Sequence, residues 1–204
     1  MSPSPESVYD RIGEEVAARA ERLWEVSLAL HGAPETAFEE REAARLLSGE
    51  LEREGFAVLR GVAGLPAAFT GRAGSGDGPC VALLMEYDAL PLLGHACGHN
   101  LIAAAGLGAA LAVRGALGEV PGIGLSEPVP GVCLGSSDIG NVGTRVPSIH
   151  PFVAIMGADA SDHTPEFAEA AAGPRGRQVT PAAAEALACT AADVLLRPEV
   201  PGRA

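Results

Sequence analysis

Lysine is missing from this chain, and all fourteen basic residues are arginine. That absence excludes a lysine Schiff base, a lysine general base and a phosphate-binding loop that ends in Gly-Lys-Ser/Thr. Aromatic residues make up only 4% of the sequence, so its core must be built mainly from alanine, leucine and valine. Basic residues are also outnumbered by 26 acidic ones, and the formal net charge is -12. This charge disfavours nucleic acids and anionic membranes as partners, and we expect a small-molecule ligand.

The chain has only four cysteines, and its amino terminus lacks the basic and then apolar pattern of a signal peptide. We therefore expect a reducing, cytoplasmic location. The apolar run 101–117 is rich in alanine and glycine and is interrupted by Arg114, so we expect it to fall short of a membrane span. With 204 residues, the chain is long enough for one core, and we expect a single domain over 1–204.

Hydrophobic periodicity predicts an α/β fold. Apolar residues at helical spacing predict helices over 7–31, 36–54, 101–117, the segment after His163, and 180–196. Short apolar runs bounded by glycine and proline predict strands over 56–59, 66–70, 81–85 and 153–156.

One stretch is dense enough in ligands to suggest a metal, namely residues 86–100. It follows the predicted strand 81–85 and precedes the predicted helix, which places it at the edge of a sheet where α/β proteins build their sites. Cys97 and His99 flank one glycine, and thiolate with imidazole suits zinc. Two ligands do not make a site, however. The alternative is a glycine-rich turn in which Cys97 is a small core residue and His99 bonds to the backbone.

The other candidates also have two interpretations. Asp88 could hold an imidazole or bridge metals, or it could cap the following turn. Glu86 at the end of a strand could face solvent. His150 and His163 stand alone, as structural histidines usually do. Gly106-x-Gly108 lies inside a helix and not in a strand-to-helix turn, which disfavours a nucleotide-binding domain.

The sequence resembles the aminoacylase-type metallopeptidases, family twenty of the metallopeptidases, in the branch of aminobenzoyl-glutamate hydrolases and dipeptidase-like proteins. The resemblance covers 7–118 and 135–196, and Asn100 matches the dipeptidase-like branch where other branches tend to have Asp. The segments that carry it are Glu86-Tyr-Asp-Ala-Leu-Pro91, Gly94-His-Ala-Cys-Gly-His-Asn100, His31-Gly-Ala-Pro-Glu35, Gly135-Ser-Ser-Asp-Ile-Gly-Asn-Val142, Pro147-Ser-Ile-His-Pro151 and His163-Thr-Pro-Glu-Phe167.

The resemblance implies a three-layer catalytic domain with a central sheet between helices, and a hydrolase that uses zinc or manganese. Its substrates would carry an amide next to a free carboxylate. Cys97, His99 and His163 would be metal ligands, and Asp88 would support the metal shell. The substrate contacts would come from Ser136, Ser137 and Asp138.

The sequence also departs from the family. Members carry a Glu-Glu pair, a further His ligand and an inserted lid domain after the helix that ends near Leu117, and here a junction at 119–134 takes their place. The first Glu of that pair is the family's general base. We therefore expect a truncated catalytic domain that binds at most one ion, turns over poorly and does not oligomerise through a lid. The alternative is a non-catalytic protein that binds a metal or ligand, or pairs with a full-length relative.

Overall fold

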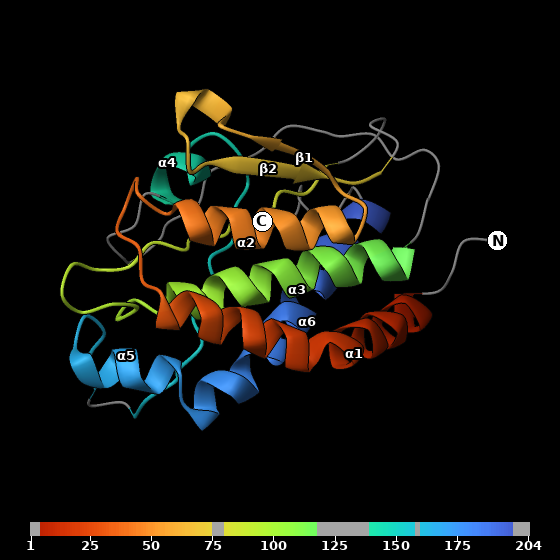
Figure 1. Ribbon diagram of the computed structural model, residues 1–204. Helices are drawn as coiled ribbons and strands as arrows, with labels where there is room; N and C mark the ends of the chain where they lie inside the picture. The colour runs from red at the N-terminus through yellow and green to blue at the C-terminus, as the bar shows by residue number, and fades with distance from the viewer. Residues whose placement is uncertain (1–4, 75–79, 118–138, 158–159, 198–204) are drawn as a thin grey trace.

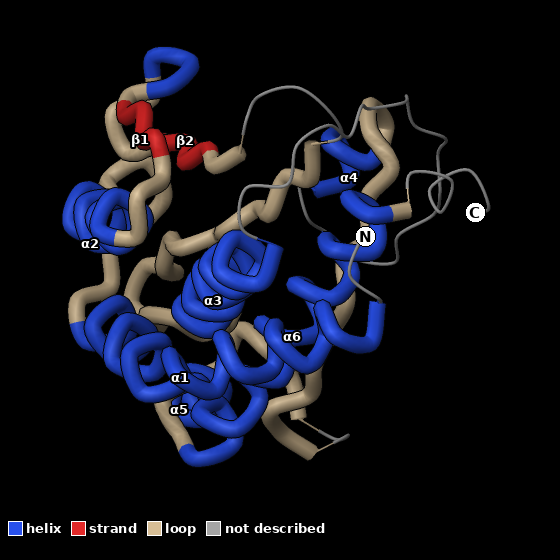
Figure 2. The backbone as a smooth tube through the Cα atoms, turned by 90° about the vertical axis from the view of Figure 1, so that its right-hand side faces the viewer, coloured by secondary structure: helices blue, strands red, loops and turns tan. Residues whose placement is uncertain are grey.

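The computed structural model describes residues 5–74, 80–117, 139–157 and 160–197. Three long helices form the main packing unit: α1 (Pro5–Gly32), α3 (His99–Leu117) and α6 (Pro174–Leu196). Seen from the side in Figure 1 and end-on in Figure 2, α3 lies between α1, α6 and the shorter α2 (Arg41–Arg53). The centre of the described structure is therefore a helix.

Small residues on α3 let its neighbours approach closely. A Cβ added at Gly108 would lie 2.6 Å from Leu23 Cδ1 of α1 and 2.9 Å from Ala184 Cβ of α6. A Cβ at Gly106 would lie 2.9 Å from Met85 Cγ. The Gly-x-Gly pair thus serves helix packing, because protein interiors leave no space for an extra methyl group at such distances.

The described strands form one antiparallel hairpin, β1 (Ala57–Arg60) and β2 (Phe69–Arg72), joined through a short 3-10 helix, η1 (Val62–Gly64). Cα pairs run from Ala57–Arg72 to Arg60–Phe69. The hairpin packs on α2. The predicted strands 56–59 and 66–70 are thus present, shifted by one and by two to three residues.

Two predicted strands are not found among the described residues. Segments 81–85 and 153–156 are described without any regular secondary structure. In 81–85 the side chains nevertheless alternate, because Leu83 and Met85 pack against the core while Ala82 and Leu84 are exposed. The alternation has the period of a strand, but a strand also needs a hydrogen-bonded neighbour, and the described residues supply none for it. The α/β class is compatible with this structure, whereas the predicted central sheet and the absence of a lid are not confirmed.

The helix boundaries differ from prediction mainly at amino ends. α2 begins at Arg41, and its first amides are capped by the Glu35 carboxylate, which accepts from the backbone N–H groups of Glu42 and Ala43 at 3.2 and 2.8 Å. α6 begins at Pro174, so Pro181 lies inside the helix. The remaining described helices are α4 (Ile139–Gly143) and α5 (Pro165–Ala171), and the side chain of Thr164 caps α5 by accepting from the Phe167 N–H.

By length and composition, α3 and α6 could each cross a membrane. This corrects the expectation that the apolar run was too short, because α3 begins two residues before the run does. The apolar window of α3 is 67% buried inside the protein, as expected of a core helix, while that of α6 is 33% buried.

Candidate functional site

The candidate site is the loop from Glu86 to His99, which leads into α3. Its amino end is fixed by the segment after α1, since the Ala89 N–H donates to the Glu35 carbonyl at 2.7 Å and Thr36 forms a parallel bridge with Ala89. The Tyr87 hydroxyl donates to the Ala67 carbonyl at 2.6 Å. Asp88 therefore lies between two residues whose positions are fixed from outside the loop.

His99, the first residue of α3, is held between two carboxylates. Its Nδ1 lies 2.8 Å from Asp88 Oδ1 and 2.9 Å from the Asp88 carbonyl oxygen, and its Nε2 lies 3.2 Å from Glu86 Oε2. Burial disfavours charge on His99, but the hydrogen bonds with Asp88 and Glu86 outweigh it and raise the pKa of His99 to about 10. The same bonds lower the pKa values of Glu86 and Asp88. His99 is thus an imidazolium at neutral pH, and both carboxylates are ionised.

The Cys97 thiol lies in acidic surroundings. Burial raises its pKa, and the nearby charges of Asp88, Asp162 and Glu86 raise it further. A raised pKa argues against a nucleophilic cysteine, which needs a stabilised thiolate. It is compatible with a thiol that ionises only when a cation arrives.

His95 is a buried histidine that connects the loop to the end of α1, a contact that the sequence did not indicate. Its side chain is 2% exposed, and its Nε2 lies 3.1 Å from the Leu30 carbonyl, with which it can hydrogen-bond. Burial lowers the pKa of His95 to about 4, so the ring is neutral, and it stacks on His31 at 6.1 Å between centroids. Within the described residues its Nδ1 has no hydrogen-bond partner. The available sequence signal was its place in the same ligand-rich stretch as Cys97 and His99.

His163 comes from a distant part of the chain and reaches this loop through its backbone. Its N–H donates to the Ala96 carbonyl at 2.9 Å, next to Cys97. Its φ is +58°, a left-handed conformation that is uncommon for a residue other than glycine and that clusters at functional sites. The side chain is 60% exposed, and its Nε2 lies 3.9 Å from Asp162 Oδ2. The backbones of the two segments therefore meet, while a shared ion remains a prediction.

The donor atoms of this loop can be compared with those that a divalent ion needs. Thiol, imidazole and carboxylate suit a divalent ion chemically. Among the described residues, however, no group of three or more His, Cys, Asp and Glu could hold one as arranged. Both ring nitrogens of His99 face carboxylates, so an ion could bind it only after one of them moves away. The predicted substrate contacts, Ser136, Ser137 and Asp138, lie outside the described residues.

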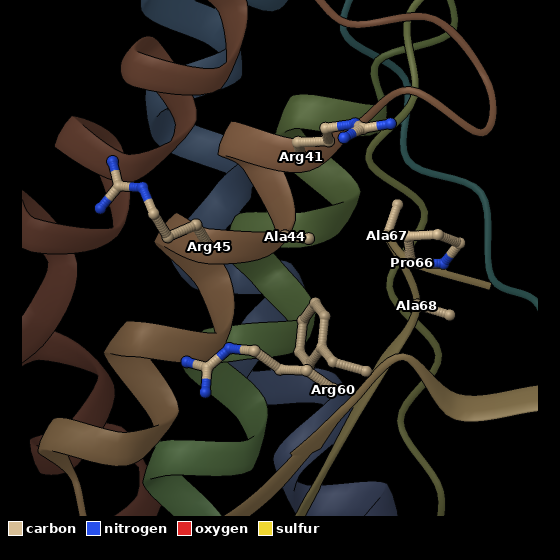
Figure 3. A pocket seen from close by; sticks show the side chains of 8 residues that line it. Arg41, Ala44, Arg45, Arg60, Pro66, Ala67 and Ala68 are labelled. Carbon is tan, nitrogen blue, oxygen red and sulfur yellow. The ribbon is translucent and has the colours of Figure 1, made fainter. Parts of the chain in front are cut away.

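A pocket of about 210 Å³ lies elsewhere, between α2 and the hairpin (Figure 3). None of residues 86–99 lines it. Arg60 on its rim is paired with Glu52 at 2.6 and 2.8 Å, and Figure 3 shows the guanidinium groups of Arg41 and Arg45 pointing in different directions. These cations do not converge on one point, so the pocket lacks the arrangement that would bind an anion.

No family model matches the sequence. The chain is 44% identical over 135 residues to a protein named Xaa-Arg dipeptidase from Mus musculus, a match that covers 62% of this chain and 31% of the relative. It is 46% identical over 123 residues to the Homo sapiens protein of the same name, with 54% and 28% covered. It is 36% identical over 126 residues to a subunit of p-aminobenzoyl-glutamate hydrolase from Escherichia coli, with 53% and 26% covered.

These relatives indicate family twenty of the metallopeptidases. The chain spans less than a third of the length of each of these relatives. Their names describe hydrolases of the dipeptidase and amidohydrolase type, and members of this family are generally metal-dependent. The resemblance noted in the sequence thus has independent support over part of the relatives' length.

Proposed function

We propose that this chain is a catalytic-domain part of a metal-dependent amide hydrolase, with Cys97, His99 and His163 as the residues that hold one divalent ion. Its substrates would be dipeptides or N-acyl amino acids, in which the amide lies next to a free carboxylate. Zinc and manganese are the ions we propose. A cytoplasmic location and the lack of nucleic-acid and membrane partners belong to the same proposal.

The observation that carries the proposal is the imidazole of His99, which is clamped between Asp88 and Glu86 and lies two residues from the thiol of Cys97. Two carboxylates face the two ring nitrogens of His99, so the site favours positive charge. In the metal-free chain this charge comes from protonation of the imidazole. Asp88 accepts from Nδ1, which is how metal-bound histidines are usually oriented by a carboxylate. The backbone bond between His163 and Ala96 holds the backbone of a further histidine at the same loop, and we propose that its imidazole turns toward the ion.

A bound divalent ion supplies Lewis-acid chemistry for amide hydrolysis. The chain's own residues then have defined tasks. Asp88 keeps His99 oriented, and Glu86 has to release Nε2 before this nitrogen can act as a ligand. Because His99 and Cys97 hold protons in the metal-free state, ion binding competes with protonation and weakens as the pH falls.

We further propose that turnover is impaired. A carboxylate that moves the proton between water and the leaving nitrogen contributes roughly 10²–10⁴-fold in rate. The segment 119–134 has no Glu-Glu pair, and Glu127 is the one carboxylate near its centre, followed by a proline that restricts its backbone. Its position lies outside the described residues.

The test combines metal content with amide hydrolysis on the purified full chain. We expect about one zinc or manganese ion per chain, lost in Cys97→Ala and His99→Ala, and rates far below the ordinary 1–10³ per second. Glu127→Gln is the matched control. Ordinary rates in the wild type would overturn the impairment, and their loss in Glu127→Gln would identify Glu127 as the base. No bound ion at saturating zinc would overturn the metal site.

The second candidate is a non-catalytic protein of the same family that binds a metal or a carboxylated ligand, or pairs with a full-length relative. One observation favours it: the described donors are not arranged to hold an ion without movement. Stoichiometric ion binding with no hydrolysis of any amide substrate would select this candidate over the first.

A further inference from the structure

Asn100 joins three helices at the base of the candidate site. It is the second residue of α3 and is 0% exposed. Its Nδ2 donates to Ser27 Oγ of α1 at 2.9 Å and to the Ala171 carbonyl at the end of α5 at 3.2 Å. A carbonyl oxygen can only accept, so the contact with Ala171 fixes which end of the amide carries the nitrogen.

The described contacts attach α5 to the rest of the fold at both ends. Two residues before its start, the His163 N–H donates to the Ala96 carbonyl at 2.9 Å. In its middle, His31 Nε2 lies 2.7 Å from the Ala168 carbonyl, and the Phe167 ring lies so close to Gly98 that an added Cβ would be 3.3 Å from it. At its end, Asn100 binds the Ala171 carbonyl. α5 has only seven residues, so these contacts, together with the packing of Ala171 and Phe167 in an apolar cluster, hold it in place.

We infer that Asn100 is a positioning residue that docks α5 and thereby holds His163 beside Cys97. This inference rests on the proposed metal site. The amide is required because a carboxylate at position 100 would place an acceptor oxygen against the Ala171 carbonyl. Two buried acceptors in contact without a hydrogen are destabilising, so an ionised Asp at this position would weaken the docking of α5, and Asp could keep the contact only by taking up a proton.

The first experiment needs no metal. Backbone hydrogen exchange is measured on the metal-free full chain for the wild type, Asn100→Ala and the matched control Ser27→Ala, which keeps the bond to Ala171. We expect protection over 163–171 to fall at least 10-fold in Asn100→Ala and to survive in Ser27→Ala, with residues 12–23 of α1 unchanged in both. Asn100→Asp, of similar size, takes its place if the alanine variant does not fold. Unchanged protection over 163–171, or an equal loss in every helix, would overturn the inference.

The second experiment asks whether Asn100 acts through His163. Zinc affinity is measured for the wild type, Asn100→Ala, His163→Ala and the double variant, with cobalt absorption as the signature of a Cys97 thiolate. Residues that orient a ligand typically change metal affinity 10- to 100-fold, so we expect Asn100→Ala to weaken binding about 10-fold in the wild type. In the His163→Ala background we expect no further loss.

The outcomes separate the two proposals. An equal loss from Asn100→Ala in both backgrounds would mean that Asn100 does not act through His163, and the inference would fall while the metal site stood. Wild-type affinity in His163→Ala would remove His163 from the proposed ligand set and refute the positioning role toward the ion. The exchange measurement would still decide independently whether Asn100 docks α5.

Discussion

The ion pair between Asp88 and His99 gives the structure its most quantitative prediction. We expect Asp88→Asn to lower the free energy of unfolding of the metal-free chain by about 1–3 kcal/mol at pH 6. The raised pKa of His99, from 6.5 to about 10, would correspond to at most about 5 kcal/mol. The expected value is smaller because the Asp88 side chain is 31% exposed and Glu86 remains as a second partner.

The sign of the pH dependence follows from the two pKa shifts. The folded-state pKa of His99 is raised, so its contribution to stability is complete below about pH 6.5 and is lost as the pH rises toward about 10. The folded-state pKa of Asp88 is lowered, so its contribution is present above its ordinary value of 3.8 and is lost as the pH falls through the lowered value. The pair therefore stabilises the fold most between about pH 3.8 and 6.5, and the difference between variant and wild type should shrink at alkaline pH.

Urea unfolding of both proteins in the presence of a chelator, from pH 5 to pH 9, measures this difference. Titration of the His99 ring protons by NMR gives its pKa directly. Asp162→Asn is the matched control, because Asp162 is 64% exposed and lies 3.9 Å from the imidazole of His163. Equal stability of wild type and Asp88→Asn at pH 6, or a His99 ring that titrates near 6.5 in the wild type, would refute the reasoning.

Three further predictions rest on the same contacts. Zinc binding at pH 7 should release about two protons per ion, one from Cys97 and one from His99. Calorimetry in two buffers of different ionisation enthalpy would count these protons. Release of fewer than one proton per ion would contradict the protonated state of the two side chains. Gly108→Ala should cost about 1–3 kcal/mol by overpacking α3, whereas Gly49→Ala, with nothing within 4 Å, should be neutral or stabilising, and equal unfolding midpoints would contradict this. Cys97 should be alkylated more slowly at pH 7 than exposed Cys80, and mass spectrometry that finds it equally reactive would contradict its raised pKa.

The long helices were predictable because their signals are local. Apolar spacing predicted α1, and Gly32 marked the end of that helix in the sequence. The start of α6 was misplaced because proline usually marks a first turn, and Pro181 lies inside the helix. The strand prediction at 81–85 failed for a different reason. Alternation is a property of one segment, but a strand exists only with a partner, and a sequence pattern does not say whether a partner is present.

The candidate site was predictable in its residues but not in its protonation. The sequence drew attention to Asp88, Cys97 and His99 because they fall within a few residues of one another. Glu86 was predicted only as a side chain that could face solvent, because nothing in its spacing shows that it meets the other nitrogen of His99. Two carboxylates on one imidazole change the chemistry of the ring, and this depends on a tertiary contact.

The clamped imidazolium also explains why the metal-free chain can hold this loop together. Glu86 and Asp88 lie at the amino end of α3, where the helix dipole favours negative charge, but two carboxylates beside a thiol would still repel one another without a cation. The proton on His99 supplies that cation. An ion that takes its place must displace the proton and move Glu86, so the free energy of metal binding is reduced by the stability of the arrangement it replaces. Contacts that stabilise the metal-free site therefore weaken metal binding. A substitution of Glu86 removes only the contact with His99 Nε2, so it should lower the stability of the metal-free chain and raise its affinity for the metal.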